Sequence, residues 1–172
     1  MGKSRFLAAI AALCLAVAAA TPASSRNVRF PEQGSPAYAI QVPDAWSVQN
    51  EGRGSVNLTA PDRSSVISLS LISDRAVELT PADELAKILL EQAKAEPFSR
   101  QEPSEIAGLK GSAYYSRVKN PQNQWFNVKL TIVKLDATHA ATTSTITIAS
   151  LTAQQKKVLD TCLKSIKLIQ GE

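Results

Sequence analysis

The sequence predicts an α+β fold, with a single, mainly antiparallel β-sheet of about six to seven strands flanked by two principal helices. Short stretches of alternating apolar and polar residues recur along the chain, as half-buried strands require. The connections between these stretches are too short for the crossovers of a parallel sheet. Two segments, one after Thr80 and one after Thr152, instead carry apolar residues at helical spacing.

The first 20 residues have the pattern of a signal peptide. Lys3 and Arg5 precede the apolar run FLAAIAALCLAVAAA, whose small final residues favour cleavage near Ala20, or alternatively near Ala23. The run is shorter than the roughly 20 apolar residues of a comfortable membrane span, although an uncleaved anchor is the alternative. We therefore expect a mature bacterial protein that is periplasmic or secreted and spans no membrane.

The mature chain is predicted to comprise an N-terminal extension (21–35) and a single domain (36–172). Removal of the leader takes two positive charges from the net charge of +4, and no basic stripe with interleaved aromatic residues remains, so nucleic-acid binding is not expected. Cys162 is then the only cysteine and cannot form an intramolecular disulfide. Stability must come from a hydrophobic core.

The first predicted strand is YAIQV, which puts Tyr38, Ile40 and Val42 on one face. Pro43 ends the strand by removing a backbone donor and begins a turn. Trp46 follows the turn, where it can fold back over the start of the sheet. Two further strands, 54–62 and 64–74, are predicted next.

The first helix is predicted to be capped by Thr80, to have Pro81 at its first position and to run to about Ala95. A hairpin connected through Gly108–Gly111 follows. The spacing of Thr152 and Gln155 predicts a capping box at the start of the last helix, whose apolar stripe contains Cys162. The remaining predicted strands are 101–107, 111–119, 125–135 and 140–150.

The longest alternation, WFNVKLTIVKL, places Lys129 on the same face as Trp125 and Thr131. In the next strand Thr143 and Thr145 share a face, which we interpret as ordinary sheet surface.

The segment AYAIQVPDAW resembles the F-x-I-x-x-P-x-x-W opening of PsbP-like domains. This superfamily includes the extrinsic oxygen-evolving protein of photosystem II, a eukaryotic Ran-binding import factor and exported bacterial DcrB-like proteins. The order of elements is similar over about residues 36–168, but only Val42–Trp46 is motif-like. The resemblance implies an α/β/α sandwich that acts in binding or assembly, and it transfers no functional residue beyond the structural Pro43 and Trp46.

The residues offer little for catalysis, and we predict neither an enzyme nor a cofactor. His139 is the only histidine, whereas zinc and iron sites use several histidines, cysteines or clustered carboxylates. A triad of Asp136, His139 and a distant serine would lack the Gly-x-Ser-x-Gly elbow, and we expect a solvated turn histidine. Cys162 is expected to be a buried, inert thiol.

The leading hypothesis is an exported, non-catalytic binding or assembly domain that acts on an envelope protein partner. Trp46, Asn120, Gln122 and Trp125 would form its binding rim, although the sequence favours a place in the core for most of the aromatic residues. The alternative is a carrier that holds a small apolar ligand or lipid in an enclosed cavity. A hydrolase using His139 ranks last.

Overall fold

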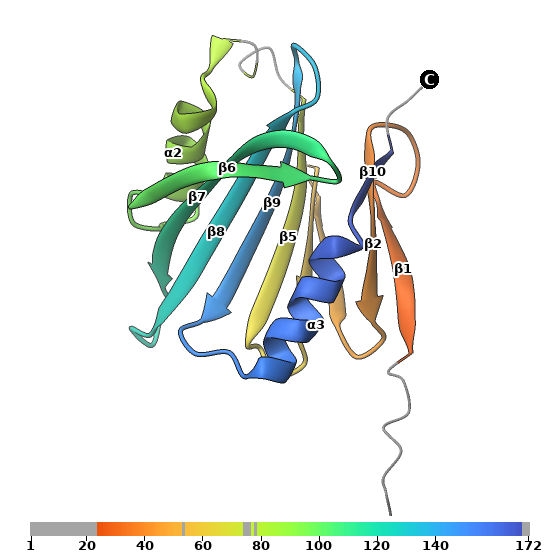
Figure 1. The fold of residues 1–172 in the computed structure, drawn as a ribbon, viewed down its shortest axis with the longest axis vertical. Helices are drawn as coiled ribbons and strands as arrows, with labels where there is room; N and C mark the ends of the chain where they lie inside the picture. Colours follow the sequence, from red (N-terminus) through yellow and green to blue (C-terminus); the bar gives the residue numbers. More distant parts are fainter. Residues whose placement is uncertain (1–23, 53, 74–76, 78, 170–172) are drawn as a thin grey trace, which may run out of the picture.

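Within the described residues, the strands form two antiparallel sheets instead of the single sheet expected. The larger has seven strands in the order β3-β4-β5-β9-β8-β7-β6, and the smaller has three in the order β1-β2-β10 (Figure 1). The computed structural model describes residues 24–52, 54–73, 77 and 79–169, so the predicted signal peptide lies outside the described residues. The elements are β1 (Ser25–Phe30), β2 (Ala37–Pro43), β3 (Ser47–Gly52), β4 (Ser55–Thr59), β5 (Ser65–Ser73), α2 (Ala82–Gln92), β6 (Arg100–Ile106), β7 (Leu109–Lys119), β8 (Trp125–Lys134), β9 (His139–Ile148), α3 (Ala153–Lys164) and β10 (Lys167–Ile169).

The smaller sheet corrects two expectations about the N-terminal part. The YAIQV strand is β2 and belongs to the smaller sheet, not to the main one. Residues 25–30, which we expected in an extension, form β1 and pair with β2 from Ser25↔Pro43 to Phe30↔Tyr38. Most of β1 is exposed and polar, with only Phe30 buried, and this weak apolar signal explains why the strand was missed.

Helices α2 and α3 cover opposite faces of the larger sheet, which confirms the α+β class. On one face, Leu85 and Leu90 of α2 pack against Tyr114 of β7 and Leu130 of β8. On the other face, α3 and the smaller sheet form a second core. Its buried members include residues of α3, both sheets and the turn after β2: Tyr38, Ile40, Trp46, Leu58, Ile67, Leu159 and Cys162.

Tyr38 fixes the smaller sheet against the larger one. Its side chain is fully buried, and its hydroxyl donates a hydrogen bond to the backbone carbonyl oxygen of Thr142 in β9 at 2.8 Å. Burial raises the pKa of Tyr38 well above its ordinary value. Trp46 adds to this core as expected, and the Arg26 guanidinium donates to the Trp46 carbonyl oxygen at 2.7 Å.

The sequence predicted the start of α3 correctly and the start of α2 incorrectly. The capping box of α3 is confirmed: the Gln155 amide donates to Thr152 Oγ1 at 3.2 Å and the Thr152 amide to Gln155 Oε1 at 2.7 Å. Gln155 also donates to Asp62 at 2.7 Å, which ties the start of α3 to the β4–β5 turn. In α2 the prediction was wrong, because Pro81 occupies the cap position, no side chain caps the helix, and it ends at Gln92.

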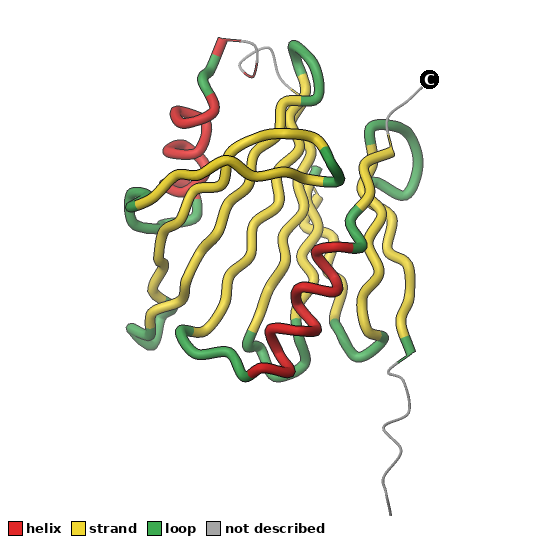
Figure 2. The backbone as a smooth tube through the Cα atoms, viewed as in Figure 1, coloured by secondary structure: helices red, strands yellow, loops and turns green. Residues whose placement is uncertain are grey.

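The β6–β7 hairpin curls over the face of the sheet that α3 also covers (Figure 2). Its turn consists of Ala107 and Gly108, both with positive φ, instead of the predicted Gly108–Gly111 connection. Ile106, the last residue of β6, is therefore brought into the same core as Leu159 of α3. Within the described residues, no helix is long and apolar enough to span a bilayer.

Candidate functional site

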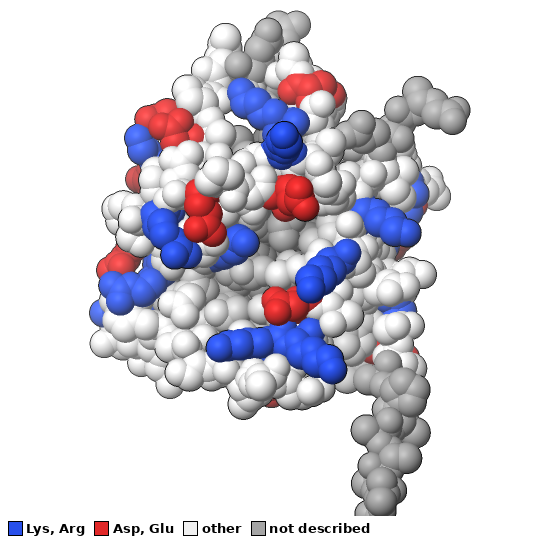
Figure 3. Space-filling view, in the orientation of Figure 1, with Lys and Arg blue, Asp and Glu red and all other residues white. Residues whose placement is uncertain are grey.

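A trough runs between α3 and the β6–β7 hairpin, over the floor made by β8 and β9. Three hollows compose it, with volumes of about 790, 630 and 110 Å³, and Leu163 lines all three. Figure 3 shows this face hollowed near its centre, with basic and acidic side chains around the hollow. We call this surface the α3 trough and its smallest part, of about 110 Å³, the inner hollow.

The register of the larger sheet builds the floor of the trough. Lys129 of β8 lies opposite Tyr115 of β7 and Thr145 of β9, and one pair further along Thr131 lies opposite Thr143. Because side chains alternate between faces, these five point to the α3 side together. The three threonines are buried, whereas Lys129 and Tyr115 are half-buried.

Tyr115 carries a small polar network at one side of this floor. Its hydroxyl donates to Glu102 of β6, and Arg100 stacks on its ring, with 3.8 Å between the guanidinium carbon and the ring centroid. Burial, and then the hydrogen bond with Glu102, raises the pKa of Tyr115. Arg100 also lies 3.8 Å from Glu102 as an ion pair, so the charges of both residues are matched.

Lys129 differs from these neighbours in lacking a charged partner. The described residues contain no ion pair and no hydrogen bond of its ammonium group, which instead lies over the Tyr115 ring, with 5.8 Å between Nζ and the ring centroid. Lys129 lines both the inner hollow and the 630 Å³ hollow. The trough therefore combines a half-buried cation with an apolar wall formed by Leu159 and Leu163.

The structure separates the four residues that we expected to form a binding rim. Trp46 is only 4% exposed, so it is a core residue and cannot form part of an exposed rim. Asn120 and Gln122 belong to the β7–β8 turn, where Asn120 donates to the Gln124 side chain at 3.0 Å. Trp125 follows this turn and is 38% exposed. The turn and Trp125 are brought together, whereas Trp46 belongs to a different turn.

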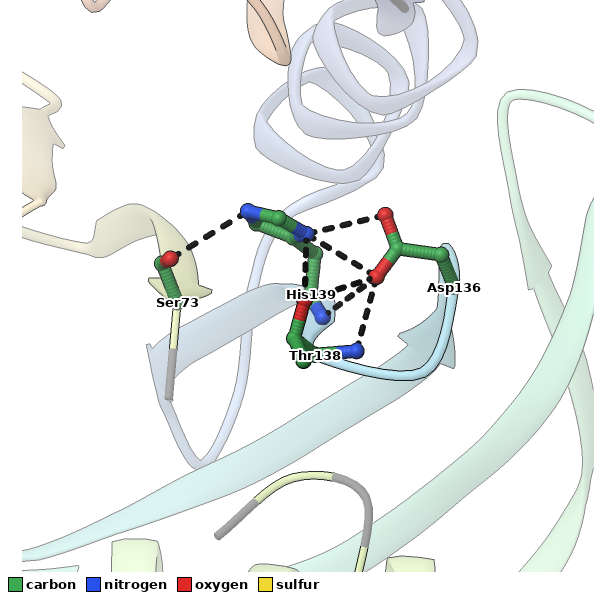
Figure 4. Close-up of polar contacts among 4 residues, drawn as sticks. All are labelled: Ser73, Asp136, Thr138 and His139. Atoms are coloured by element: carbon green, nitrogen blue, oxygen red, sulfur yellow. Dashed lines mark hydrogen bonds and ion pairs between the residues drawn. The ribbon is translucent and has the colours of Figure 1, made fainter. Parts of the chain in front are cut away.

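Ser73, His139 and Asp136 form a second polar cluster, at the end of β5 (Figure 4). His139 Nε2 lies 3.2 Å from Ser73 Oγ, and Nδ1 lies 2.8 Å from Asp136 Oδ2. The contacts follow the order of a catalytic triad: a serine, a histidine base and a carboxylate that orients the histidine. Ser73 thus stands in the position of the distant serine of the triad considered from the sequence.

Local structure accounts for each contact of this cluster. Ser73 and His139 are a cross-strand pair of β5 and β9. Asp136 accepts backbone hydrogen bonds from Thr138 at 2.8 Å and His139 at 2.9 Å, as in an Asx turn, and these bonds lower the pKa of Asp136. None of the three hollows of the trough is lined by these residues. We interpret the cluster as the closure of the β8–β9 turn onto β5.

Cys162 is expected to resist alkylation while the protein is folded. Its side chain is 2% exposed, and burial raises the pKa of its thiol to about 11. Since the thiolate is the reactive form, iodoacetamide at about pH 8 should modify the mature chain only as fast as it unfolds. Intact-mass measurements of native and guanidinium-unfolded protein check this. Labelling of both samples at equal rates would contradict the burial of α3 against the smaller sheet.

Comparisons with known proteins support the fold. No protein-family model and no curated protein matches the chain. Among solved structures, the cyanobacterial PsbP (CyanoP) of Synechocystis sp. PCC 6803 is 15% identical, with a TM-score of 0.55 over 88% of this chain and 96% of that chain. The chain has a PsbP-like fold. The likeness thus confirms at the level of fold what the AYAIQVPDAW segment suggested.

Two further structures share this PsbP-like fold. LpqN, described as involved in cell envelope biogenesis of Mycobacterium tuberculosis, is 12% identical, with a TM-score of 0.53 over 84% of this chain and 90% of that chain. A protein of Bacteroides thetaiotaomicron VPI-5482 is 13% identical, with a TM-score of 0.50 over 77% of this chain. The matched region spans only 45% of that longer protein.

The polar faces of β8 and β9 were the sequence signal for the trough. Alternation correctly put Lys129 and Thr131 on one face of β8, and Thr143 and Thr145 on one face of β9. Only the register of the two strands shows that these faces are the same one and that Lys129 lies opposite Thr145. Lys129, a charged residue in the middle of a long and otherwise regular strand, was the residue that could have indicated a functional face.

Proposed function

We propose that the protein is an exported, non-catalytic binding domain of the bacterial cell envelope that holds a small amphipathic molecule in the α3 trough. The observation that carries this proposal is the mixed lining of the trough. Leu159 and Leu163 supply an apolar wall, and Lys129 with Thr145 supplies a polar floor. The two larger hollows, of about 790 and 630 Å³, fall within the size range of small-molecule sites.

The geometry favours an amphipathic ligand over the purely apolar one of our sequence-based alternative. That alternative required an enclosed apolar cavity, whereas the trough is open at the surface between α3 and the hairpin (Figure 3). A wholly apolar ligand would bury the ammonium of Lys129 without a partner, which is unfavourable. Placement in the envelope is supported by the predicted signal peptide and by the description of LpqN.

Small molecules that purify with the protein from its native envelope test this function. We compare the wild type with Leu163→Trp, which fills the centre of the trough, and with Ile88→Trp, which adds the same indole on the 45% exposed Ile88 of α2. Native mass spectrometry should find a bound small molecule in the wild type and in I88W, but not in L163W. Retention by L163W, or an empty wild type, would contradict the proposal.

A protein partner is the second candidate, and the surroundings of Trp125 favour it. Arg117 and Lys119 lie over its ring, with their charged groups 4.7 and 4.5 Å from the centroid, so the exposed indole is framed by cations. Aromatic and arginine side chains are enriched where proteins bind one another. If this surface is the functional one, Trp125→Ala should abolish the capture of a specific envelope protein, and L163W should leave that capture unchanged.

A further inference from the structure

Lys129 and Thr143 are both left without the partners that buried polar groups normally have. Lys129 is half-buried on the floor of the α3 trough, and the described residues give its ammonium no counter-ion. Thr143 is 6% exposed, and its Oγ1 is the buried side-chain oxygen that lacks a hydrogen-bond partner among the described residues. The Tyr38 phenol lies beside Thr143 and its oxygen can accept the Thr143 proton, but the phenol donates its own proton to the Thr142 carbonyl oxygen and so gives no hydrogen bond to Thr143 Oγ1.

Both groups line the same inner hollow. Thr131 and Thr145 line it as well, next to Lys129, so one ammonium and several hydroxyls converge on a small space. Buried polar groups without partners are uncommon in folded proteins, and such groups call for a ligand or water that pairs with them. An ammonium together with hydroxyl donors is the chemistry that binds an oxyanion.

The volume of the inner hollow limits what it can hold. Its volume of about 110 Å³ is room for roughly three or four waters at about 30 Å³ each, or for one carboxylate or phosphate group. An acyl chain does not fit there, but the adjoining 630 Å³ hollow, bounded by Leu159 and Leu163, can take one. The two hollows share Lys129, Thr145 and Leu163, so a ligand can extend from one into the other.

We infer that the ligand of the α3 trough is an amphiphile with one anionic headgroup, which binds Lys129 and the Thr143 hydroxyl in the inner hollow while its chain lies along α3. This inference rests on the proposed function and names the class of ligand. Glu105 lines the inner and the largest hollow, and Asp160 lines both larger hollows. Glu105 opposes an anion within the inner hollow itself, so binding of the headgroup depends on Lys129, and both carboxylates disfavour a ligand with further negative charges along its length.

Matched twelve-carbon probes test the inference by calorimetry on the mature protein. Dodecanoate and dodecyl phosphate should bind the wild type, and dodecanol should bind more weakly, because it lacks the charge. Lys129→Met should lower the affinity for the two anions by about ten- to hundredfold, the loss expected for a hydrogen bond to a charged group. The affinity for dodecanol should stay unchanged. Lys129→Arg keeps the cation and should restore most of the affinity for the anions. Lys119→Met removes a lysine that does not line the trough and should change nothing.

The outcomes separate this inference from the proposed function. If dodecanol and dodecanoate bind equally, or if K129M still binds dodecanoate as the wild type does, the inference of an anionic headgroup is wrong. The proposal of an amphipathic ligand would then still stand. Failure of all three probes, with no small molecule in the protein from the envelope, would overturn both. Thr143→Val is a second variant, and it should weaken the binding of the two anionic probes. Its thermal midpoint should change by no more than a few degrees, because an unpartnered hydroxyl contributes little to folding.

Discussion

Replacing Trp46 with alanine is expected to lower the free energy of unfolding by about 3–5 kcal/mol, the range for removing a large buried aromatic side chain. Trp46 is 4% exposed and packs in the core that joins α3, the smaller sheet and the larger sheet. For a chain of this size the loss corresponds to a fall of about 10 °C in Tm. Urea and thermal unfolding of the mature protein measure it.

Trp125→Ala is the matched control, because it removes the same side chain from an exposed position. Trp125 is 38% exposed at the end of the larger sheet, and its main contacts are the cations Arg117 and Lys119. We expect this variant to lose less than about 1 kcal/mol, as most surface substitutions do. Equal losses for the two tryptophans would show that Trp46 does not seal the core.

Gly111→Ala is expected to destabilise the protein by about 3 kcal/mol, at the upper end of typical overpacking costs. A Cβ at Gly111 would lie 2.0 Å from the backbone oxygen of Ile132 and 2.8 Å from Val133 Cγ2. Since one obstructing atom belongs to the backbone, β7 and β8 must move apart to relieve the clash. Denaturant unfolding measures the loss.

The neighbouring residue provides the control for this variant. Lys110 is exposed in the same strand, so Lys110→Ala should change the free energy of unfolding by less than about 0.5 kcal/mol. Because Gly111 directly precedes the first β7–β8 pair, Ser112↔Ile132, in the hairpin that borders the α3 trough, G111A should also weaken ligand binding in the trough. A variant as stable as the wild type would mean that the two strands are not in close contact at this point.

Local patterns predicted most elements of the larger sheet. In WFNVKLTIVKL, one face of β8 packs in the core with α2 and the other face forms the polar floor of the trough, and strict alternation therefore reports the two faces correctly. The start of α3 was equally clear, because the capping box depends on residues only three positions apart.

The division into two sheets could not be derived in the same way. β2 pairs with β1 before it and with β10, which lies more than a hundred residues further along the chain. β10 has only three residues, Lys167–Ile169, too few for a periodic pattern. The choice of partner strands is made by tertiary packing, which alternation within one strand does not encode.

The candidate site shows the same limit. Trp46 and Trp125 each follow a turn, and composition gives no reason for one to be buried and the other exposed. The difference arises because α3 and the smaller sheet cover the first and not the second. Lys129 and Thr143 were visible in the sequence as members of a polar face, but their lack of partners in the described part of the chain is a property of the assembled trough.

The central claim is that the α3 trough is where the protein holds its ligand. The most direct measurement compares amide NMR spectra of the mature protein as purified from its envelope and after extraction of bound small molecules. We predict that the changes concentrate on β8, β9 and α3, around Lys129, Thr145 and Leu163. Identical spectra, or changes confined to the turn before Trp125, would contradict the claim.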